Sequence, residues 1–177
     1  SSVLFGHIRA ATDGEKNNLN AHPFEYGRVL WMHNGGVSGF ASIKDQLLSK
    51  IKCPKVQAVI KGGTDSELLG ALFMHHAAGS RVCDSAVRFH MHELRQAMVR
   101  TLADIESLHS PQCETGDSLN LAVTDGEHVV AIRFRSCPTE DPPSLYFAAG
   151  ERWIGDGMNM SGSVADHVLV HSPAFVV

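Results

Sequence analysis

The first part of the chain consists of short apolar runs separated by polar breaks. Residues 3–9 (VLFGHIR) and 28–33 (RVLWMH) are short and rich in β-branched and aromatic side chains, which is typical of buried strands. Residues 12–20 between them are polar and predict a loop. The second run stops at Asn34-Gly35-Gly36, where glycine adopts positive φ at little cost.

Helical spacing follows this strand pattern. Apolar residues three to four positions apart predict a helix over 40–51, which ends before Pro54. Thr64 and Glu67 fit a capping box, so a second helix is predicted to begin after Thr64, with the Glu67 side chain reaching back to the N-cap. A third, longer helix is predicted from about residue 84 to 108 by one continuous apolar stripe.

The pattern returns to strands after Pro111. Residues 119–124 and 129–134 predict a hairpin that turns at Asp125-Gly126. Residues 145–148 and 168–170 predict two more short strands. Strands, then helices, then strands again, with no βαβ alternation, indicate an α+β fold with antiparallel sheets, and we predict a single domain over 1–177.

Composition and charge narrow the class of protein. The 177 residues are 44% hydrophobic and 19% charged, as in an ordinary soluble domain, and carry a formal charge of −4. This mildly acidic balance argues against a nucleic-acid partner, and no apolar run approaches the roughly 20 residues that would cross a membrane. Four scattered cysteines, none in a CxxC spacing, predict reduced thiols and a cytoplasmic location.

Three stretches place polar groups at the ends of apolar elements. Arg9 offers a planar fork for a carboxylate, although taken by itself an ordinary ion pair at the edge of the core is the favoured explanation. The Asn34 amide beside the Gly35 N–H suits an oxyanion hole, although Asn-Gly is also a common turn. Asp65, in the first turn of a helix, suits a substrate ammonium but is also favoured there by the helix dipole.

The eleven histidines raise a metal-binding hypothesis that their spacing does not favour. Two of them are adjacent and two lie two residues apart on a predicted helix, so neither pair shares a helix face. We therefore predict no metal and no cofactor, and keep a histidine-rich metal-binding protein only as a third hypothesis.

Taken together and in order, these stretches resemble the class II glutamine amidotransferases. The matching segments are residues 6–12 (GHIRAAT), 20–24 (NAHPF), 31–35 (WMHNG) and 63–67 (GTDSE), with further support from 119–126 (LNLAVTDG) and 144–147 (SLYF). The resemblance implies the N-terminal-nucleophile (Ntn) hydrolase fold, a four-layer αββα sandwich of antiparallel sheets. Within the family, the motifs are most similar to the amidotransferase subunit of glutathione degradation, which acts beside a metallopeptidase-like partner. The bacterial γ-glutamyl hydrolases of ergothioneine synthesis are also close.

The resemblance assigns a role to each candidate residue. Arg9, assisted by Thr12, would bind the α-carboxylate of a small-molecule γ-glutamyl substrate, and Asp65 would bind its α-ammonium group. The Asn34 side chain and the Gly35 backbone N–H would form the oxyanion hole.

The chain departs from the family at the nucleophile. The family uses an N-terminal Cys whose own α-amine acts as the general base, and this Cys is expected some tens of residues upstream of residues 3–9. We therefore expect a fragment, incomplete at the N-terminus and inactive as it stands. The leading hypothesis is hydrolysis of the γ-glutamyl amide of glutamine, or of γ-glutamyl peptides such as glutathione. The alternative is a non-catalytic amidotransferase-fold subunit that binds γ-glutamyl ligands or a partner protein.

Overall fold

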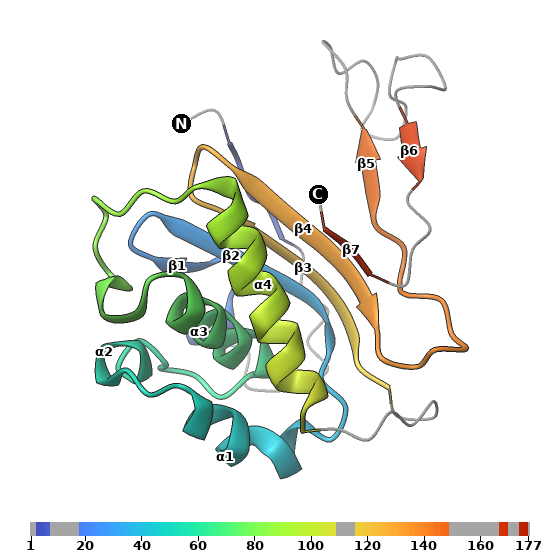
Figure 1. The fold of residues 1–177 in the computed structure, drawn as a ribbon, viewed down its shortest axis with the longest axis horizontal. Coiled ribbons are helices and arrows are strands. Elements are labelled where there is room, and N and C mark those ends of the chain that lie inside the picture. Colours follow the sequence, from blue (N-terminus) through green and yellow to red (C-terminus); the bar gives the residue numbers. More distant parts are fainter. Residues whose placement is uncertain (1–2, 8–17, 109–115, 149–166, 170–173, 177) are drawn as a thin grey trace.

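A five-stranded antiparallel sheet forms the centre of the computed structural model, which describes residues 3–7, 18–108, 116–148, 167–169 and 174–176 (Figure 1). The strand order is β1-β2-β3-β4-β7, and β5 and β6 form a separate two-stranded antiparallel sheet. The strands are β1 (Phe24–Tyr26), β2 (Val29–Gly36), β3 (Ser118–Thr124), β4 (Val129–Arg135), β5 (Tyr146–Ala148), β6 (His167–Leu169) and β7 (Ala174–Val176). The predicted α+β class with antiparallel pairing is confirmed.

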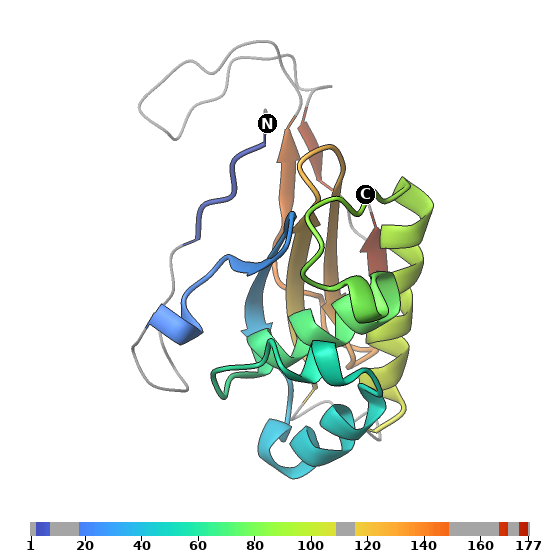
Figure 2. The ribbon, with the colours of Figure 1, turned by 90° about the vertical axis from the view of Figure 1, so that its left-hand side faces the viewer.

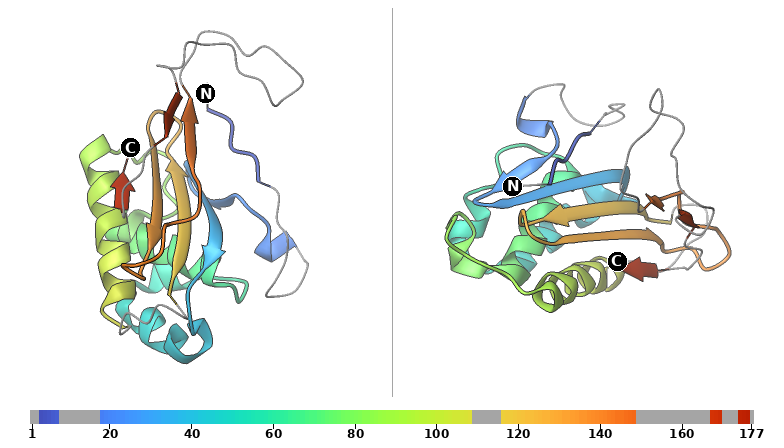
Figure 3. Two further views of the ribbon diagram at one scale, coloured as in Figure 1. Left: turned by 90° about the vertical axis from the view of Figure 1, so that its right-hand side faces the viewer. Right: turned by 90° about the horizontal axis from the view of Figure 1, so that it is seen from above.

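The helices cover one face of the five-stranded sheet, and residues 3–7 run past the opposite face (Figures 2 and 3). The helices are α1 (Phe40–Lys50), α2 (Pro54–Gln57), α3 (Asp65–Ala77) and α4 (Met91–Glu106), with 3-10 turns at Asn18–Asn20 and Gly79–Arg81. No helix in the described part of the chain is both long and apolar enough to cross a membrane.

The core lies between the sheet and the helices, and strand alternation determines which side chains enter it. Along β2, Val29, Trp31 and His33 are buried, whereas the two residues between them are half-buried. Trp31 packs against Phe73 of α3, with ring centroids 5.3 Å apart. A Cβ atom at Gly70 would lie 2.9 Å from Trp31 Cδ1, so the absence of a side chain there lets α3 approach β2 closely. This close approach positions the N-terminus of α3 beside the end of β2.

The longest helix is shorter than its apolar stripe predicts. The expected start near residue 84 is wrong, because α4 begins at Met91 after His90 as N-cap. The Glu93 carboxylate accepts a hydrogen bond from the His90 N–H, which stops the helix from extending toward the N-terminus. Val87 and Phe89 are buried from the preceding loop, and this burial accounts for the apolar pattern that resembled helix.

Two other predictions are wrong, and two strands were not predicted. The described part of the predicted strand over 3–9, residues 3–7, is assigned to no strand, and the sequence did not predict β1 or β7. The prediction of four reduced cysteines is wrong, because Cys137 is disulfide-bonded, although Cys53 and Cys83 are free.

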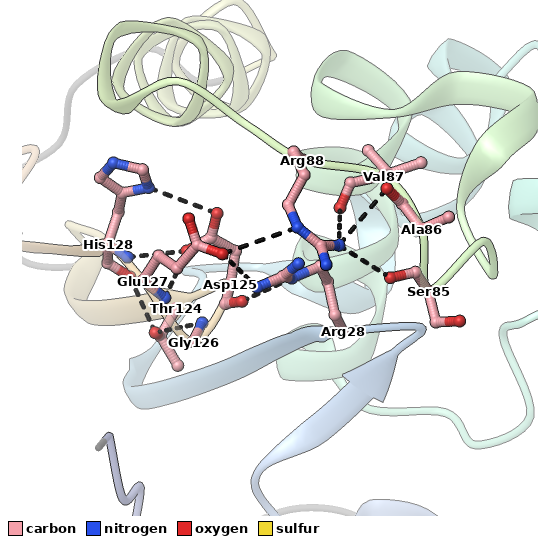
Figure 4. Close-up of polar contacts among 10 residues, drawn as sticks. All are labelled: Arg28, Ser85, Ala86, Val87, Arg88, Thr124, Asp125, Gly126, Glu127 and His128. Atoms are coloured by element: carbon pink, nitrogen blue, oxygen red, sulfur yellow. Dashed lines mark hydrogen bonds and ion pairs between the residues drawn. The ribbon is translucent and has the colours of Figure 1, made fainter. Parts of the chain in front are cut away.

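A polar cluster fixes the hairpin end of the sheet (Figure 4). The Asp125 carboxylate accepts hydrogen bonds from the N–H groups of Glu127 and His128, which closes the β3–β4 loop. Arg28, from the β1–β2 turn, donates to the Asp125 carbonyl at 2.7 Å and pairs with Glu127 at 3.0 Å, and Arg88 approaches Glu127 at 3.6 Å. These contacts fix the register of β2 and β3, whose opposite ends carry the candidate site.

Candidate functional site

The candidate residues meet where β2 ends beside the N-terminus of α3. Asn34 and Gly35 lie just before Gly36, the last residue of β2, and pair with Asn120 and Leu119 of β3. Asp65 is the first residue of α3. Arg9 and Thr12 lie outside the described residues, so their predicted roles remain predictions.

Asp65 is hydrogen-bonded directly to the segment that follows Gly35. Its Oδ2 accepts from the Val37 N–H at 3.0 Å, and its Oδ1 accepts from the Ser66 N–H at 2.7 Å. A Cβ atom at Gly36 would lie 3.8 Å from Asp65 Oδ2. The structure thus brings together three of the five residues predicted from sequence, namely Asn34, Gly35 and Asp65.

Two alternate side chains of β2 hold the first turn of α3 in place. Trp31 Nε1 donates to the Ser66 carbonyl at 3.0 Å, and His33 Nδ1 lies 2.9 Å from Ser66 Oγ. The Ser66 hydroxyl has a single hydrogen, which it donates to Asp65 Oδ1 at 3.3 Å; both contacts are hydrogen bonds when His33 carries its hydrogen on Nδ1 and donates to Ser66 Oγ. A chain of hydrogen bonds therefore runs from His33 through Ser66 to Asp65.

His33 is held in its neutral form by its surroundings. Burial lowers its pKa below the ordinary value of 6.5 against the opposite effect of Asp65, and His7 lowers it further. With Nδ1 carrying the hydrogen, Nε2 is an unprotonated nitrogen, and it is buried with no hydrogen-bond partner among the described residues. His33 belongs to the WMHNG motif, but no role was predicted for it.

Two carboxylates hold the turn after β2. The Val37 N–H donates to Asp65, and the next N–H, that of Ser38, donates to Asp117 Oδ1 at 2.8 Å. Asp117 is buried and precedes β3, so both carboxylates come from outside the strand whose end they fix. Asp117 was not predicted as part of the site. Its only indication in the sequence is that an acidic residue comes just before an apolar strand.

Gly35 has a conformation that suits glycine and few other residues. Its φ is +118°, and a Cβ atom there would overlap the backbone carbonyl of Ser118 on β3. The absence of a side chain therefore lets β2 and β3 remain paired to their ends at the site.

The loop before α3 is held by Glu67 in a way the capping-box prediction did not anticipate. Thr64 is the N-cap as predicted, and its hydroxyl accepts from the Glu67 N–H at 3.3 Å. The buried Glu67 carboxylate, however, accepts from the N–H groups of Lys61 at 2.6 Å and Gly62 at 2.7 Å. Tyr26 donates to the Glu67 carbonyl, and burial together with the nearby Glu67 carboxylate raises the pKa of Tyr26 far above its usual range.

His7 joins the site from the other face of the sheet. Its Nε2 lies 3.0 Å from Asn34 Oδ1 and 3.2 Å from the His33 carbonyl oxygen. Its ring stacks on His22, with centroids 4.2 Å apart. His7 belongs to the GHIRAAT motif, but no function was predicted for it.

This arrangement can bind a ligand that carries an ammonium group and a polarisable carbonyl. Asp65 offers a half-buried carboxylate that accepts a hydrogen bond from the Val37 N–H. Asn34 and Gly35 come just before Val37, at the end of β2. A carboxylate attracts an ammonium ion, whereas amide N–H donors stabilise negative charge on oxygen.

Comparisons with known proteins identify relatives of this chain. A family model for glutamine amidotransferases class-II matches residues 1–138. The probable glutamine amidotransferase DUG3 of Saccharomyces cerevisiae is 37% identical over 161 residues, which are 87% of this chain and 45% of that protein. The isomerizing glutamine--fructose-6-phosphate aminotransferase of Thermococcus kodakarensis is 35% identical over 92 residues, 51% of this chain and 14% of that protein.

A solved structure extends the likeness to three dimensions. A glutamine aminotransferase class-II domain protein from Silicibacter pomeroyi aligns with a TM-score of 0.52 and 28% sequence identity, covering 73% of this chain and 52% of that one. The predicted fold class, α+β of the Ntn-hydrolase type, is therefore confirmed. This chain spans 45% of the yeast protein and about half of the solved chain. Because the family model covers more than half of its residues, the chain belongs to the class-II glutamine amidotransferases.

Proposed function

We propose that this chain carries the substrate-binding and oxyanion-stabilising groups of an enzyme that hydrolyses γ-glutamyl amides. One observation carries the proposal. Asp65 Oδ2 accepts a hydrogen bond at 3.0 Å from the N–H of Val37, two residues after Gly35, and this bond holds Asp65 beside the strand end that carries Asn34 and Gly35. The nucleophile in this proposal is an N-terminal Cys upstream of the chain, as the family resemblance implies.

A γ-glutamyl group has two ends that suit this arrangement. Its α-ammonium would bind Asp65, and its α-carboxylate would bind Arg9 with help from Thr12. Its amide carbonyl would then lie at the Asn34 side chain and the Gly35 N–H. Fixing the charged end of the substrate in this way orients the amide for attack and reduces the entropy cost of reaching the transition state.

The proposed reaction places negative charge on the carbonyl oxygen. The cysteine thiol would give its proton to its own α-amine and attack the amide carbon, which turns the carbonyl oxygen into an oxyanion. Donors at Asn34 and Gly35 would stabilise this oxyanion, and loss of one such donor typically costs about 3 kcal/mol. The α-amine would then protonate the leaving amine, and water would release glutamate from the thioester.

Strand geometry supports the role of the Gly35 N–H. In an extended strand, the N–H of a residue points to the same side as the C=O two residues earlier. The His33 carbonyl lies 3.2 Å from His7 Nε2. The Gly35 N–H is therefore expected on the His7 side of β2, where a substrate carbonyl can reach it.

The choice of γ-glutamyl compound rests on similarity. The relation to DUG3 extends over 87% of this chain, and the motifs resemble glutathione-degrading amidotransferases, so we favour γ-glutamyl peptides such as glutathione alongside glutamine. A metallopeptidase-like partner subunit and a cytoplasmic location belong to the same proposal.

A non-catalytic binding subunit is the second candidate. It is favoured by the absence of any thiol among the described residues that are hydrogen-bonded to Asn34 or Asp65. Such a subunit would bind glutathione or glutamine through Asp65 without releasing glutamate.

Kinetics of the natural full-length protein distinguish the two candidates. We expect glutamate release from glutamine or glutathione, with Asp65→Ala raising KM by at least tenfold because it removes ground-state binding. Asn34→Ala should lower kcat by roughly 100-fold or more because it removes an oxyanion donor. Asp45→Ala, an exposed acidic residue of α1, serves as the control and should change neither constant.

Each outcome leads to a conclusion. An unchanged KM in Asp65→Ala would remove the assigned role of this residue. Calorimetric binding of glutathione without any glutamate release would favour the non-catalytic subunit.

A further inference from the structure

We propose that His7 is the positioning residue of the oxyanion hole, because its Nε2–H turns the Asn34 side-chain amide so that the NH₂ group faces the substrate. The inference rests on the proposed function of Asn34 and adds a residue that acts through it. Its basis is the pair of contacts from His7 Nε2, at 3.0 Å to Asn34 Oδ1 and at 3.2 Å to the His33 carbonyl oxygen.

The backbone carbonyl identifies which atoms of His7 and Asn34 face each other. A carbonyl oxygen can only accept, so the contact with the His33 oxygen requires a hydrogen on His7 Nε2. This hydrogen then points also at the Asn34 side chain, where an acceptor is favourable and an NH₂ group is not. Asn34 must therefore present Oδ1 to His7, and its Nδ2 is turned the other way.

The outward Nδ2 is the group that an oxyanion needs. Among the described residues, no hydrogen bond engages Asn34 Nδ2, and the residue is exposed at the end of β2. Rotation of the amide by 180° would instead aim the Oδ1 lone pairs at the developing negative charge. His7 therefore decides whether Asn34 stabilises or repels the oxyanion.

The His7 ring is itself held in place by aromatic contacts. It stacks on His22 at 4.2 Å with an interplanar angle of 24°, and His22 meets the buried Phe24 of β1 edge-on at 4.8 Å. The neutral Nε2–H tautomer and the doubly protonated ring both keep the hydrogen on Nε2. Protonation of His7 should therefore leave the Asn34 amide in place.

The test compares variants that separate the ring of His7 from its donor. His7→Phe keeps a flat ring to stack on His22 and removes the N–H, whereas His7→Gln supplies an amide N–H donor without the ring. In the full-length protein, His7→Phe should lower kcat by roughly tenfold to 100-fold with KM within about twofold, because an amide free to rotate loses much of one oxyanion donor. His7→Gln should recover most of kcat, and His92→Phe, an exposed histidine on α4, should behave as wild type.

Nitrogen-15 NMR gives a readout that does not depend on hydrolysis. In the wild-type protein His7 Nε2 should show the shift of a protonated nitrogen at neutral and at acidic pH, and the Asn34 NH₂ signals should move in His7→Phe and stay in His92→Phe. A wild-type His7 with its hydrogen on Nδ1 alone would overturn the proposal, as would a His7→Phe enzyme with unchanged kcat. If the wild-type protein hydrolyses no γ-glutamyl amide, the proposed function fails, and the NMR signals still decide whether His7 orients Asn34.

Discussion

Ser66 connects strand β2 to Asp65, the residue proposed to bind the substrate ammonium. Ser66 receives hydrogen bonds from Trp31 and His33 of β2, and its own N–H and hydroxyl both donate to Asp65 Oδ1. The hydroxyl can donate to Asp65 only if His33 carries a hydrogen on Nδ1. The tautomer of neutral His33 is therefore coupled to the arrangement of the site.

The burial of His33 predicts a stability that is sensitive to acid. Burial lowers the pKa of folded His33 below 6.5, so as the pH falls below about 6.5 the unfolded chain takes up a proton that the folded chain does not. The free energy of unfolding should consequently decrease between pH 6.5 and the lower folded-state pKa, and be regained above pH 6.5.

Urea unfolding at a series of pH values measures this dependence. His33→Gln should flatten the slope between pH 6.5 and 5, whereas His92→Gln, at an exposed position, should keep it. His75, whose pKa is also lowered mainly by burial, contributes in the same direction and accounts for any slope that remains. A wild-type slope in His33→Gln would contradict the prediction, because it would show that folding does not lower the pKa of His33.

At the scale of the elements, the end of β2 depends on two adjacent glycines with different surroundings. Gly35 has a φ of +118° and no room for a side chain against the Ser118 carbonyl. Gly36 lacks a positive φ, and a Cβ atom there would meet Asp65 Oδ2 at an ordinary 3.8 Å.

The two glycines form a matched pair of variants. Gly35→Ala should lower the free energy of unfolding by roughly 2 kcal/mol or more, because the new methyl group must displace β3 and also occupy a strained backbone conformation. Gly36→Ala should change it by less than about 1 kcal/mol. Thermal or urea unfolding of both variants checks this, and equal losses would contradict the assigned role of the β2–β3 contact.

The sequence predicted elements whose signals are local. The helix that became α1, the Thr64 N-cap of α3 and the β3–β4 hairpin were each predicted from a few adjacent residues, and all three were confirmed. Asn34, Gly35 and Asp65 were predicted as a set because a family motif surrounds each of them. The start of α4 was not predictable from periodicity, because buried loop residues imitate a helical stripe.

Contacts between distant segments were beyond local reasoning. Asp117 accepts a hydrogen bond from the Ser38 N–H, 79 positions away in the sequence. His7 is hydrogen-bonded to Asn34, 27 positions away. Strand β7 has only three residues and is defined by its pairing with β4, which no pattern within those residues specifies. Composition cannot reveal such pairings, since they depend on which elements the fold makes neighbours.

At the scale of the whole molecule, one carboxylate forms hydrogen bonds that connect three of the helices packed on the five-stranded sheet. Asp104 of α4 accepts from Lys50 of α1 at 2.9 Å and from His76 Nε2 of α3 at 2.8 Å. All three side chains are less than one-third exposed, so water screens these contacts only in part. Because α3 carries the candidate binding residue Asp65 at its other end, Asp104 contributes to the stability of the element that positions this residue.

The network predicts a stability loss that depends on pH. Burial alone would raise the pKa of Asp104, but the hydrogen bonds from Lys50 and His76 outweigh it and lower the pKa below 3.8. A lowered carboxyl pKa stabilises the fold at pH values above the unfolded-state pKa, and this contribution is lost as the pH falls through the folded-state pKa.

Asp104→Asn should therefore reduce the free energy of unfolding by about 1–3 kcal/mol at pH 7, and the difference from wild type should shrink as the pH falls below about 4. Asp45→Asn, on the exposed side of α1, is the control for the loss of one negative charge and should be nearly neutral at both pH values. If Asp104→Asn matches Asp45→Asn at pH 7, the three helices are held together by apolar packing alone and the carboxylate is dispensable.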